Sequence, residues 1–314
     1  MKNSFMFLFL FVGLRIFAQE IDVAQLEKHV YYLADDAMKG RGTGSKQNKK
    51  AANYIAKQFK KYQLQPLGEK GFFQHFEAKV KRVVVPDSIR AARNVIGFLD
   101  NQAEKTIVIG AHYDHLGEGK QGSSLAKNSE GIIHNGADDN ASGVAGLLEL
   151  ARVFSQNRIQ EPVNFLFIAF GAEELGLLGS RYFVNHPTHD LNKIHWMLNM
   201  DMIGRFNYEK GLSIIGFGTS PVFETIFNNL NTTDVVSFNT KFEGRGGSDQ
   251  TSFYEKNIPV LFFHTEGHDD YHKPTDDAMK IEYNAMKNIL DFERAIIEES
   301  FKYKTMPFRN TDKK

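Results

Sequence analysis

The sequence contains no cysteine among its 314 residues. This excludes disulfide bonds, thiolate metal sites and cysteine nucleophiles, so any metal ion must be held by histidine, aspartate or glutamate. The chain also has no excess charge, because 38 lysines and arginines balance 38 aspartates and glutamates. A neutral chain has no overall field to attract nucleic acid or an anionic membrane. We therefore expect no nucleic-acid partner.

Long apolar runs are lacking as well, apart from a short one at the start. Residues 5–14 are mostly apolar, Lys2 precedes them, and the small residue Ala18 stands before Gln19. The run is shorter than the roughly 20 residues of a membrane-spanning helix, and the pattern is typical of a secretory signal peptide over residues 1–18. With no cysteine for a lipid anchor, we expect a mature chain without a stable membrane anchor, periplasmic or secreted.

Beyond residue 20, strand-like and helix-like patterns alternate, which predicts one α/β domain over residues 19–314. We expect a three-layer sandwich with a mixed, mainly parallel central sheet and helices on both faces. Strand patterns lie at 94–99, 106–110, 163–170, 196–202 and 259–264, and helical patterns at 45–62, 141–154, 177–184, 221–230 and 281–300. The first two strand patterns are expected to pair. Residues 117–135 are rich in glycine and serine, and we interpret them as a loop insertion that shapes a substrate pocket.

Acidic residues and histidines repeatedly follow the predicted strands. They are His112, Asp114, Glu173, Glu174, Asp201, His264 and His272, while Asp138 and Asp139 directly precede a helix. Ligands of open α/β sheets bind where strands end, and scattered surface acids would not favour these places. Imidazoles and carboxylates without sulfur suit Zn²⁺, and they are also compatible with Mn²⁺ or Co²⁺.

Five separated motifs occur in one order along the chain. They are His112-Tyr113-Asp114, Gly136 to Gly143, Gly171 to Glu174, Asn199-Met200-Asp201 and Tyr271-His272. Together they resemble the secreted bacterial co-catalytic di-zinc aminopeptidases of the leucyl-aminopeptidase type, which are related to glutamate carboxypeptidase and glutaminyl cyclase. The resemblance covers residues 35 to 295 and includes the segment Gly40 to Ser45. It implies a zinc-dependent exopeptidase acting on peptides with a free N-terminus.

The resemblance also implies a set of metal ligands. One zinc ion would be held by His112 and Asp201, a second by Glu174 and His272, and Asp138 would bridge the two. Two dications, three carboxylates and one bridging hydroxide sum to zero charge. The hydroxide would attack the scissile carbonyl.

Further roles concern proton transfer and positioning. By resemblance, Glu173 would be the general base, Tyr271 would donate a hydrogen bond to the developing oxyanion, and a cis peptide would join Asp138 to Asp139. Asp114 lies two residues after His112, hence on the same side if the strand persists, where its carboxylate could accept the imidazole N–H.

Three other histidines near the motifs are not predicted to be metal ligands. His268 and His272 have the spacing of a helical metal pair, but Gly267 and Pro274 indicate a loop, so only His272 is predicted as a ligand. His115 and His264 are expected near the site but outside the ligand set.

Alternatives to an aminopeptidase stay open at this point. A carboxypeptidase or dipeptidase could use the same metal chemistry, and glutaminyl-cyclase-like acyl transfer occurs in the same fold family. The complete ligand set argues against the cyclase, and together with Glu173 it argues against a non-catalytic binding domain. Residues 243–250, between Phe242 and Phe253, resemble the substrate-pocket region of the family.

Overall fold

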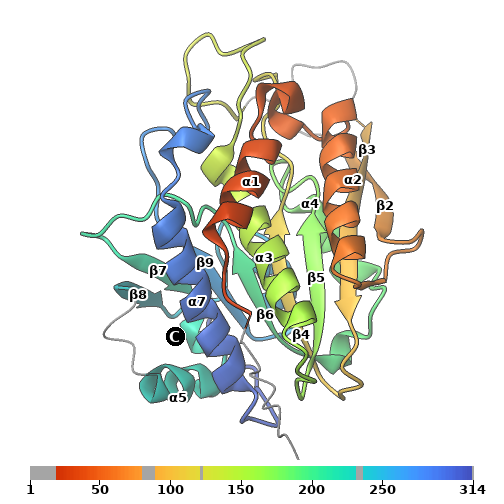
Figure 1. Cartoon of the computed structure of the whole chain (residues 1–314), viewed down its shortest axis with the longest axis vertical. Coiled ribbons are helices and arrows are strands. Elements are labelled where there is room, and N and C mark those ends of the chain that lie inside the picture. The colour runs from red at the N-terminus through yellow and green to blue at the C-terminus, as the bar shows by residue number, and fades with distance from the viewer. Residues whose placement is uncertain (1–18, 80–88, 121–122, 231–235, 313–314) are drawn as a thin grey trace, which may run out of the picture.

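The computed structural model describes residues 19–79, 89–120, 123–230 and 236–312. The predicted signal peptide, 1–18, lies outside these described residues. Nine strands in the described ranges form one mixed sheet with the order β1-β3-β5-β4-β6-β9-β7-β8, and β2 also pairs with β3 (Figure 1). The strands are β1 (Gln65–Pro66), β2 (Phe73–Lys79), β3 (Ile89–Leu99), β4 (Thr106–His112), β5 (Asn164–Phe170), β6 (Ile194–Met200), β7 (Leu212–Ile215), β8 (Phe238–Lys241) and β9 (Val260–His264).

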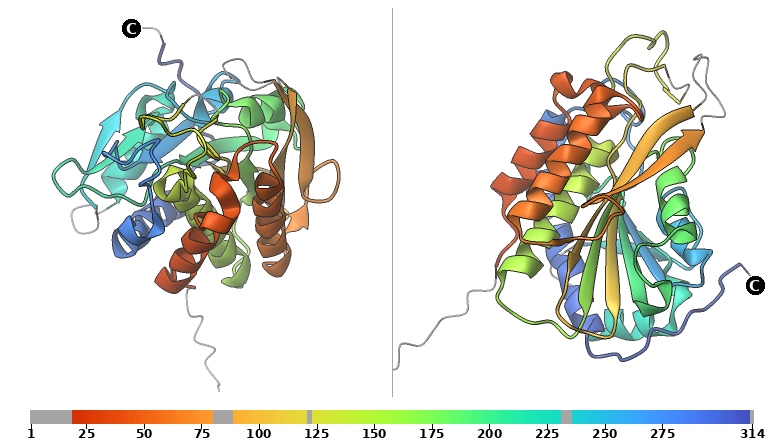
Figure 2. Two further views of the ribbon diagram at one scale, coloured as in Figure 1. Left: turned by 90° about the horizontal axis from the view of Figure 1, so that it is seen from above. Right: turned by 90° about the vertical axis from the view of Figure 1, so that its right-hand side faces the viewer.

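Helices cover both faces of this sheet, as the side view in Figure 2 shows. One face carries α1 (Val23–Leu33), α2 (Lys46–Lys61), α3 (Gly143–Gln156), α5 (Pro221–Asn229) and α7 (Tyr283–Ser300). The other face carries α4 (Leu178–Asn185) and the short α6 (Gln250–Tyr254). The predicted three-layer α/β architecture is confirmed. No helix of the described ranges has the length and apolar character needed to cross a membrane.

The central strands show why these layers form. All seven residues of β5 are buried, with Phe165 and Phe167 packing on the α3 side and Leu166 and Ile168 packing on the opposite side. A strand that is buried on both faces is expected to be continuously apolar. The helices follow from equally local signals, since Ser45 caps α2 by accepting a hydrogen bond from the Asn48 amide at 3.0 Å.

The expected pairing of strands 94–99 and 106–110 is wrong. Strand β5 lies between β3 and β4, antiparallel to the first and parallel to the second. Its apolar side chains require burial on both faces, and the centre of the sheet provides this. As a result β5, β4, β6 and β9 form a parallel block whose carboxyl ends meet at one edge of the sheet.

Candidate active site

The predicted site residues gather at this edge. His112 is the last residue of β4, Glu173 and Glu174 follow β5, and Asp201 directly follows β6. His272 reaches the same place from the loop beyond β9. All five line one cavity of about 350 Å³, together with Asp139 from the turn η2 (Ala137–Ser142) that precedes α3.

Asp139 lies between the two histidines and directs one carboxylate oxygen to each. Its Oδ1 is 3.4 Å from Nε2 of His112, and its Oδ2 is 3.2 Å from Nε2 of His272. His112 Nε2 is also 3.3 Å from Asp201 Oδ1, and His272 Nε2 is 3.3 Å from Glu174 Oε2. The side chains thus form two groups of three that share one carboxylate.

These four distances suit ligands of a common cation better than hydrogen bonds. A tetrahedral ion with ligands at about 2.0–2.1 Å separates its ligand atoms by about 3.3–3.4 Å, whereas charged N–H···O bonds measure about 2.7–2.9 Å. The side chains that form the two groups are only 1–13% exposed; they are those of His112, Asp139, Glu174, Asp201 and His272. Three carboxylates buried this closely would repel one another without a positive partner. The donor set therefore fits divalent metal ions.

The structure corrects the predicted bridging residue, since Asp138 points away from both groups. Its Oδ1 accepts a hydrogen bond from the Gly204 amide at 2.7 Å, and its Oδ2 lies 3.0 Å from Nε2 of His268. Asp139 takes the bridging position because the turn is not helical at this residue, so that the two neighbouring carboxylates diverge. The cis peptide joins Asp139 to Asn140, one residue later than expected.

The turn that carries Asp139 is held by a carboxylate that the sequence analysis missed. Both oxygens of Asp276 lie 3.0 Å from the amide of Asp138, and one accepts from the amide of Asp139 at 3.0 Å. Burial, together with nearby Asp138, raises the pKa of Asp276 to about 6. Its only sequence signal is an acid four positions after His272. Asp276 thus fixes the backbone from which the shared carboxylate projects.

A buried arginine ties neighbouring segments together beneath the site. The Arg41 guanidinium donates to the backbone carbonyls of Leu33, Tyr113, Asn135 and Gly136 at 2.6–2.9 Å. Burial lowers the pKa of Arg41 to about 10, so the group stays charged at neutral pH. It joins the end of α1, the segment after β4 and the approach to η2.

Backbone carbonyls orient the two candidate ligand histidines. Nδ1 of His112 lies 3.2 Å from the carbonyl oxygen of Asp114, and Nδ1 of His272 lies 3.0 Å from that of Ser123. If each Nδ1 carries the proton, it donates to the carbonyl and leaves the Nε2 lone pair facing the carboxylates.

The predicted role of Asp114 is only partly right. Its carboxylate is 3.9 Å from His112 Nδ1, too far for a hydrogen bond, because β4 ends at His112 and the strand alternation stops there. Instead the carboxylate accepts from the Thr43 hydroxyl at 2.8 Å and from the Glu173 amide at 3.0 Å. Asp114 therefore positions Glu173 through its side chain and His112 through its main chain.

Glu173 lies beside the His112 group without a hydrogen bond to it. Its Oε2 is 3.9 Å from His112 Nε2, and the residue is 9% exposed. Burial raises the pKa of Glu173 well above its ordinary value; His112 opposes this shift, and the negative charges of Glu174 and Asp201 add to it. A buried carboxylate with a raised pKa, facing a cavity, is suited to moving protons.

The other predicted neighbours also lie close by. Tyr271 lines the cavity, and its ring stacks on the His272 ring with centroids 3.9 Å apart. His264 contacts the backbone carbonyl of Asp201 through Nδ1 at 2.7 Å. His115 contacts Oε1 of Glu174 through Nδ1 at 2.8 Å, a hydrogen-bond distance. Both histidines thus contact candidate ligands without joining the two groups at their 3.2–3.4 Å spacing.

Apolar side chains line the cavity as well. They are Met202, Ile215 and Phe262, and Gly247 of the predicted pocket segment 243–250 lies among them. None of the described residues of the loop 117–135 lines the cavity. The loop contacts His272 instead, so its proposed influence on the substrate pocket remains a hypothesis.

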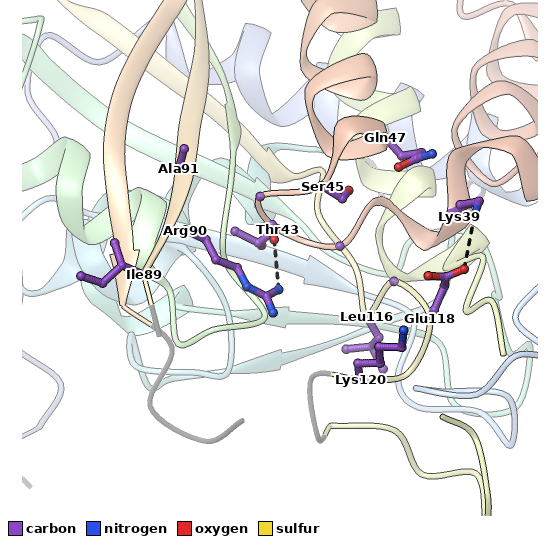
Figure 3. A pocket seen from close by; sticks show the side chains of 13 residues that line it. Lys39, Thr43, Ser45, Gln47, Ile89, Arg90, Ala91, Leu116, Glu118 and Lys120 are labelled. Atoms are coloured by element: carbon purple, nitrogen blue, oxygen red, sulfur yellow. Dashed lines mark hydrogen bonds and ion pairs between the residues drawn. The ribbon is translucent and has the colours of Figure 1, made fainter. Parts of the chain in front are cut away.

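A second, larger hollow of about 530 Å³ lies beside the Gly40 to Ser45 segment (Figure 3). Arg90 donates to the Thr43 carbonyl at 3.1 Å within it, and Lys39 pairs with Glu118 at its rim. Among the described residues that line it there is no histidine, and Glu118 is the single acidic one. The candidate metal ligands therefore lie in the smaller cavity.

Comparison with known proteins identifies the family. The model of peptidase family M28 matches residues 94–297, which is more than half of the chain. The chain belongs to this family. Aminopeptidase YwaD of Bacillus subtilis is 31% identical over 230 residues, covering 69% of this chain and 47% of the relative. The chain thus spans about half the length of that relative. The suspected family is confirmed.

Two solved structures share the fold. A leucine aminopeptidase precursor from Bacteroides thetaiotaomicron superposes with a TM-score of 0.69 at 18% identity, covering 90% of this chain and 98% of the other. A glutaminyl cyclase from Porphyromonas gingivalis gives a TM-score of 0.71 at 16% identity, covering 90% and 100%. Since both activities occur on this fold, the fold alone does not choose between them.

Proposed function

We propose that the chain is a zinc-dependent exopeptidase, specifically an aminopeptidase that removes N-terminal residues from peptides. The observation that carries the proposal is the position of Asp139, which offers one oxygen to the His112 group and the other to the His272 group. A carboxylate used in this way suits two metal ions. Membership of a peptidase family supports peptide hydrolysis as the reaction.

We infer that His112, Asp139 and Asp201 would hold one zinc ion, and that Asp139, Glu174 and His272 would hold the other. Histidine nitrogen and carboxylate oxygen are typical ligand atoms of catalytic zinc. Mn²⁺ or Co²⁺ could bind to the same ligands. Bound zinc would polarise the scissile carbonyl and lower the pKa of a water molecule.

The chain's own residues would then move the protons. Glu173 would take a proton from the attacking water and transfer it to the departing amine, a role worth about 10²–10⁴ in rate. The Tyr271 hydroxyl, on a ring held against His272, would donate a hydrogen bond to the developing oxyanion. The free amine of the substrate would lie beside Asp201, as the proposed aminopeptidase activity requires.

For the cellular location, we propose a periplasmic or secreted enzyme whose residues 1–18 are removed as a signal peptide. This proposal is supported by the sequence pattern of Lys2, the apolar residues 5–14 and Ala18. N-terminal sequencing of the protein from its source would test the cleavage before Gln19.

The activity is tested on unblocked and N-acetylated peptides, before chelation, after chelation and after zinc return. We expect release of amino acid from unblocked peptides only, dependent on zinc, with two zinc ions per chain. The Glu173→Gln variant should retain both ions and lose turnover. Equal cleavage of acetylated peptides would assign another peptidase class. Ring closure of N-terminal glutamine without cleavage would favour the cyclase.

A further inference from the structure

An ion pair that includes Lys241 lines the site cavity; Lys241 ends β8, and three strands separate β8 from β4, which ends at His112. Nζ of Lys241 lies 2.9 Å from Oε1 of Glu266, and both residues line the same cavity as His112 and Glu173. Their side chains are 47% and 35% exposed. A substrate group that extends from His112 and Asp201 across the sheet toward β8 would therefore approach this pair.

The path from the metal ligands to the pair is fixed by strand register. Phe262 on β9 is the partner of Ile215 on β7, and Ile215 is the partner of Lys241 on β8. Cross-strand partners lie on the same face of a sheet, so the three side chains form one row. Phe262 is 5% exposed and Ile215 is partly buried. The row is thus apolar near the site and charged at its far end.

The two charges balance each other. The hydrogen bond from Lys241 is the main cause that lowers the pKa of Glu266, so the pair stays ionised at neutral pH. A neutral substrate side chain on the row would meet no net charge. A charged substrate side chain would lose hydration where it contacts Phe262 and Ile215, which costs free energy. It would then lie next to one member of the ion pair that carries the same charge. Binding it well would require the Lys241–Glu266 contact to open.

We propose that the Lys241–Glu266 pair is a charge filter that restricts the N-terminal residue of the substrate to neutral, mainly apolar side chains. This inference rests on the proposed aminopeptidase function. Removing one partner would free the other to bind an oppositely charged side chain. Glu266→Gln would favour N-terminal glutamate through Lys241, and Lys241→Gln would favour N-terminal lysine through Glu266.

The test compares kcat/KM for otherwise identical peptides that begin with leucine, glutamate or lysine. The unmodified zinc enzyme should prefer leucine. Relative to the leucine peptide, Glu266→Gln should raise kcat/KM for the glutamate peptide about tenfold and leave that for the lysine peptide unchanged. Lys241→Gln should raise kcat/KM for the lysine peptide and leave that for the glutamate peptide unchanged. The double variant Lys241→Glu with Glu266→Lys keeps a pair of opposite charges and should restore the leucine preference.

A matched control uses an ion pair of similar exposure outside the cavity. Arg245 pairs with Glu255, with side chains 50% and 39% exposed, so Glu255→Gln should leave the substrate profile unchanged. Absence of opposite shifts in the two single variants, or equal use of all three peptides by the unmodified enzyme, would overturn the filter. Absence of leucine release by the zinc-loaded unmodified enzyme would instead remove the proposed function. Circular dichroism would confirm that each variant is folded.

Discussion

Nδ1 of His272 lies 3.0 Å from the backbone carbonyl oxygen of Ser123, a residue 149 positions earlier in the chain. The contact is returned, because the amide of Leu125 donates to the carbonyl of His272 at 3.0 Å. The loop after β4 thus holds a candidate metal ligand through both its imidazole and its backbone. Partners of this kind fix the orientation of a ligand histidine.

We therefore predict that Leu125→Pro weakens zinc binding at the His272 group, because proline has no amide hydrogen to donate to His272. Leu125→Ala keeps the amide and removes only a side chain that is 62% exposed. Competition with a chelator should show an affinity loss of about 10–100-fold for one zinc ion in the proline variant alone. Equal affinities in the two variants would show that the loop contact does not support the ligand.

A second prediction separates the adjacent carboxylates of η2. Asp139→Asn should lose the shared anionic ligand, and with it at least one bound zinc ion and most of the activity. Asp138→Asn keeps an oxygen for the Gly204 amide, so it should retain both ions. Elemental analysis of the two purified variants gives the result directly. Loss of zinc from the Asp138 variant alone would return the bridging role to Asp138.

The third prediction concerns the Tyr271 hydroxyl. Tyr271→Phe keeps the ring that stacks on His272 and removes only the oxygen. Because the hydrogen bond to the oxyanion would form mainly in the transition state, kcat should fall about 10²–10³-fold with little change in KM or zinc content. A rise in KM at constant kcat would instead assign the hydroxyl to substrate binding.

The fourth prediction concerns stability rather than catalysis. Glu293 on α7 is fully buried, and neither carboxylate oxygen has a hydrogen-bond partner within the described part of the chain. Burial raises the pKa of Glu293 well above its ordinary value. Its stabilising contribution is complete below the unfolded-state pKa and is lost as the pH rises through the folded-state pKa. Glu293→Gln, which stays neutral, should therefore be more stable than the unmodified protein at high pH.

Urea unfolding at pH 5 and pH 8.5 would measure this difference. We expect the variant's advantage to be small at pH 5 and to grow to about 1–3 kcal/mol at pH 8.5. The exposed Glu104→Gln serves as the control and should show no such growth. An advantage that does not change between pH 5 and pH 8.5 would show that folding does not raise the pKa of Glu293.

The sequence was sufficient to predict the elements with strong local signals. Helix α2 has its serine cap and its apolar spacing, and β5 and β9 are continuous apolar runs. Strand β8 (Phe238–Lys241) escaped prediction because it is four residues long, largely exposed and mostly polar. Its place in the sheet depends on β7, which sequence spacing does not reveal.

The sequence could not predict site residues whose role depends on the local direction of the backbone. Strand ends placed His112, Glu174, Asp201 and His272 among the candidates, the family resemblance selected them as ligands, and they line one cavity as expected. The choice between Asp138 and Asp139 depended on the turn geometry at one residue, which no side-chain pattern records. Asp276 was missed for a related reason, because its role is to accept backbone amides and no motif marks that role.

Arg41 also bears on how much of the chain forms a working unit. Every candidate ligand lies within the family match at residues 94–297, yet Arg41 and Thr43 precede that stretch. Arg41 holds the carbonyls of Asn135 and Gly136, and Thr43 holds the Asp114 carboxylate. A fragment trimmed to the family match would keep all the metal donors and lose these supports. A fragment that keeps these supports must therefore begin before Arg41.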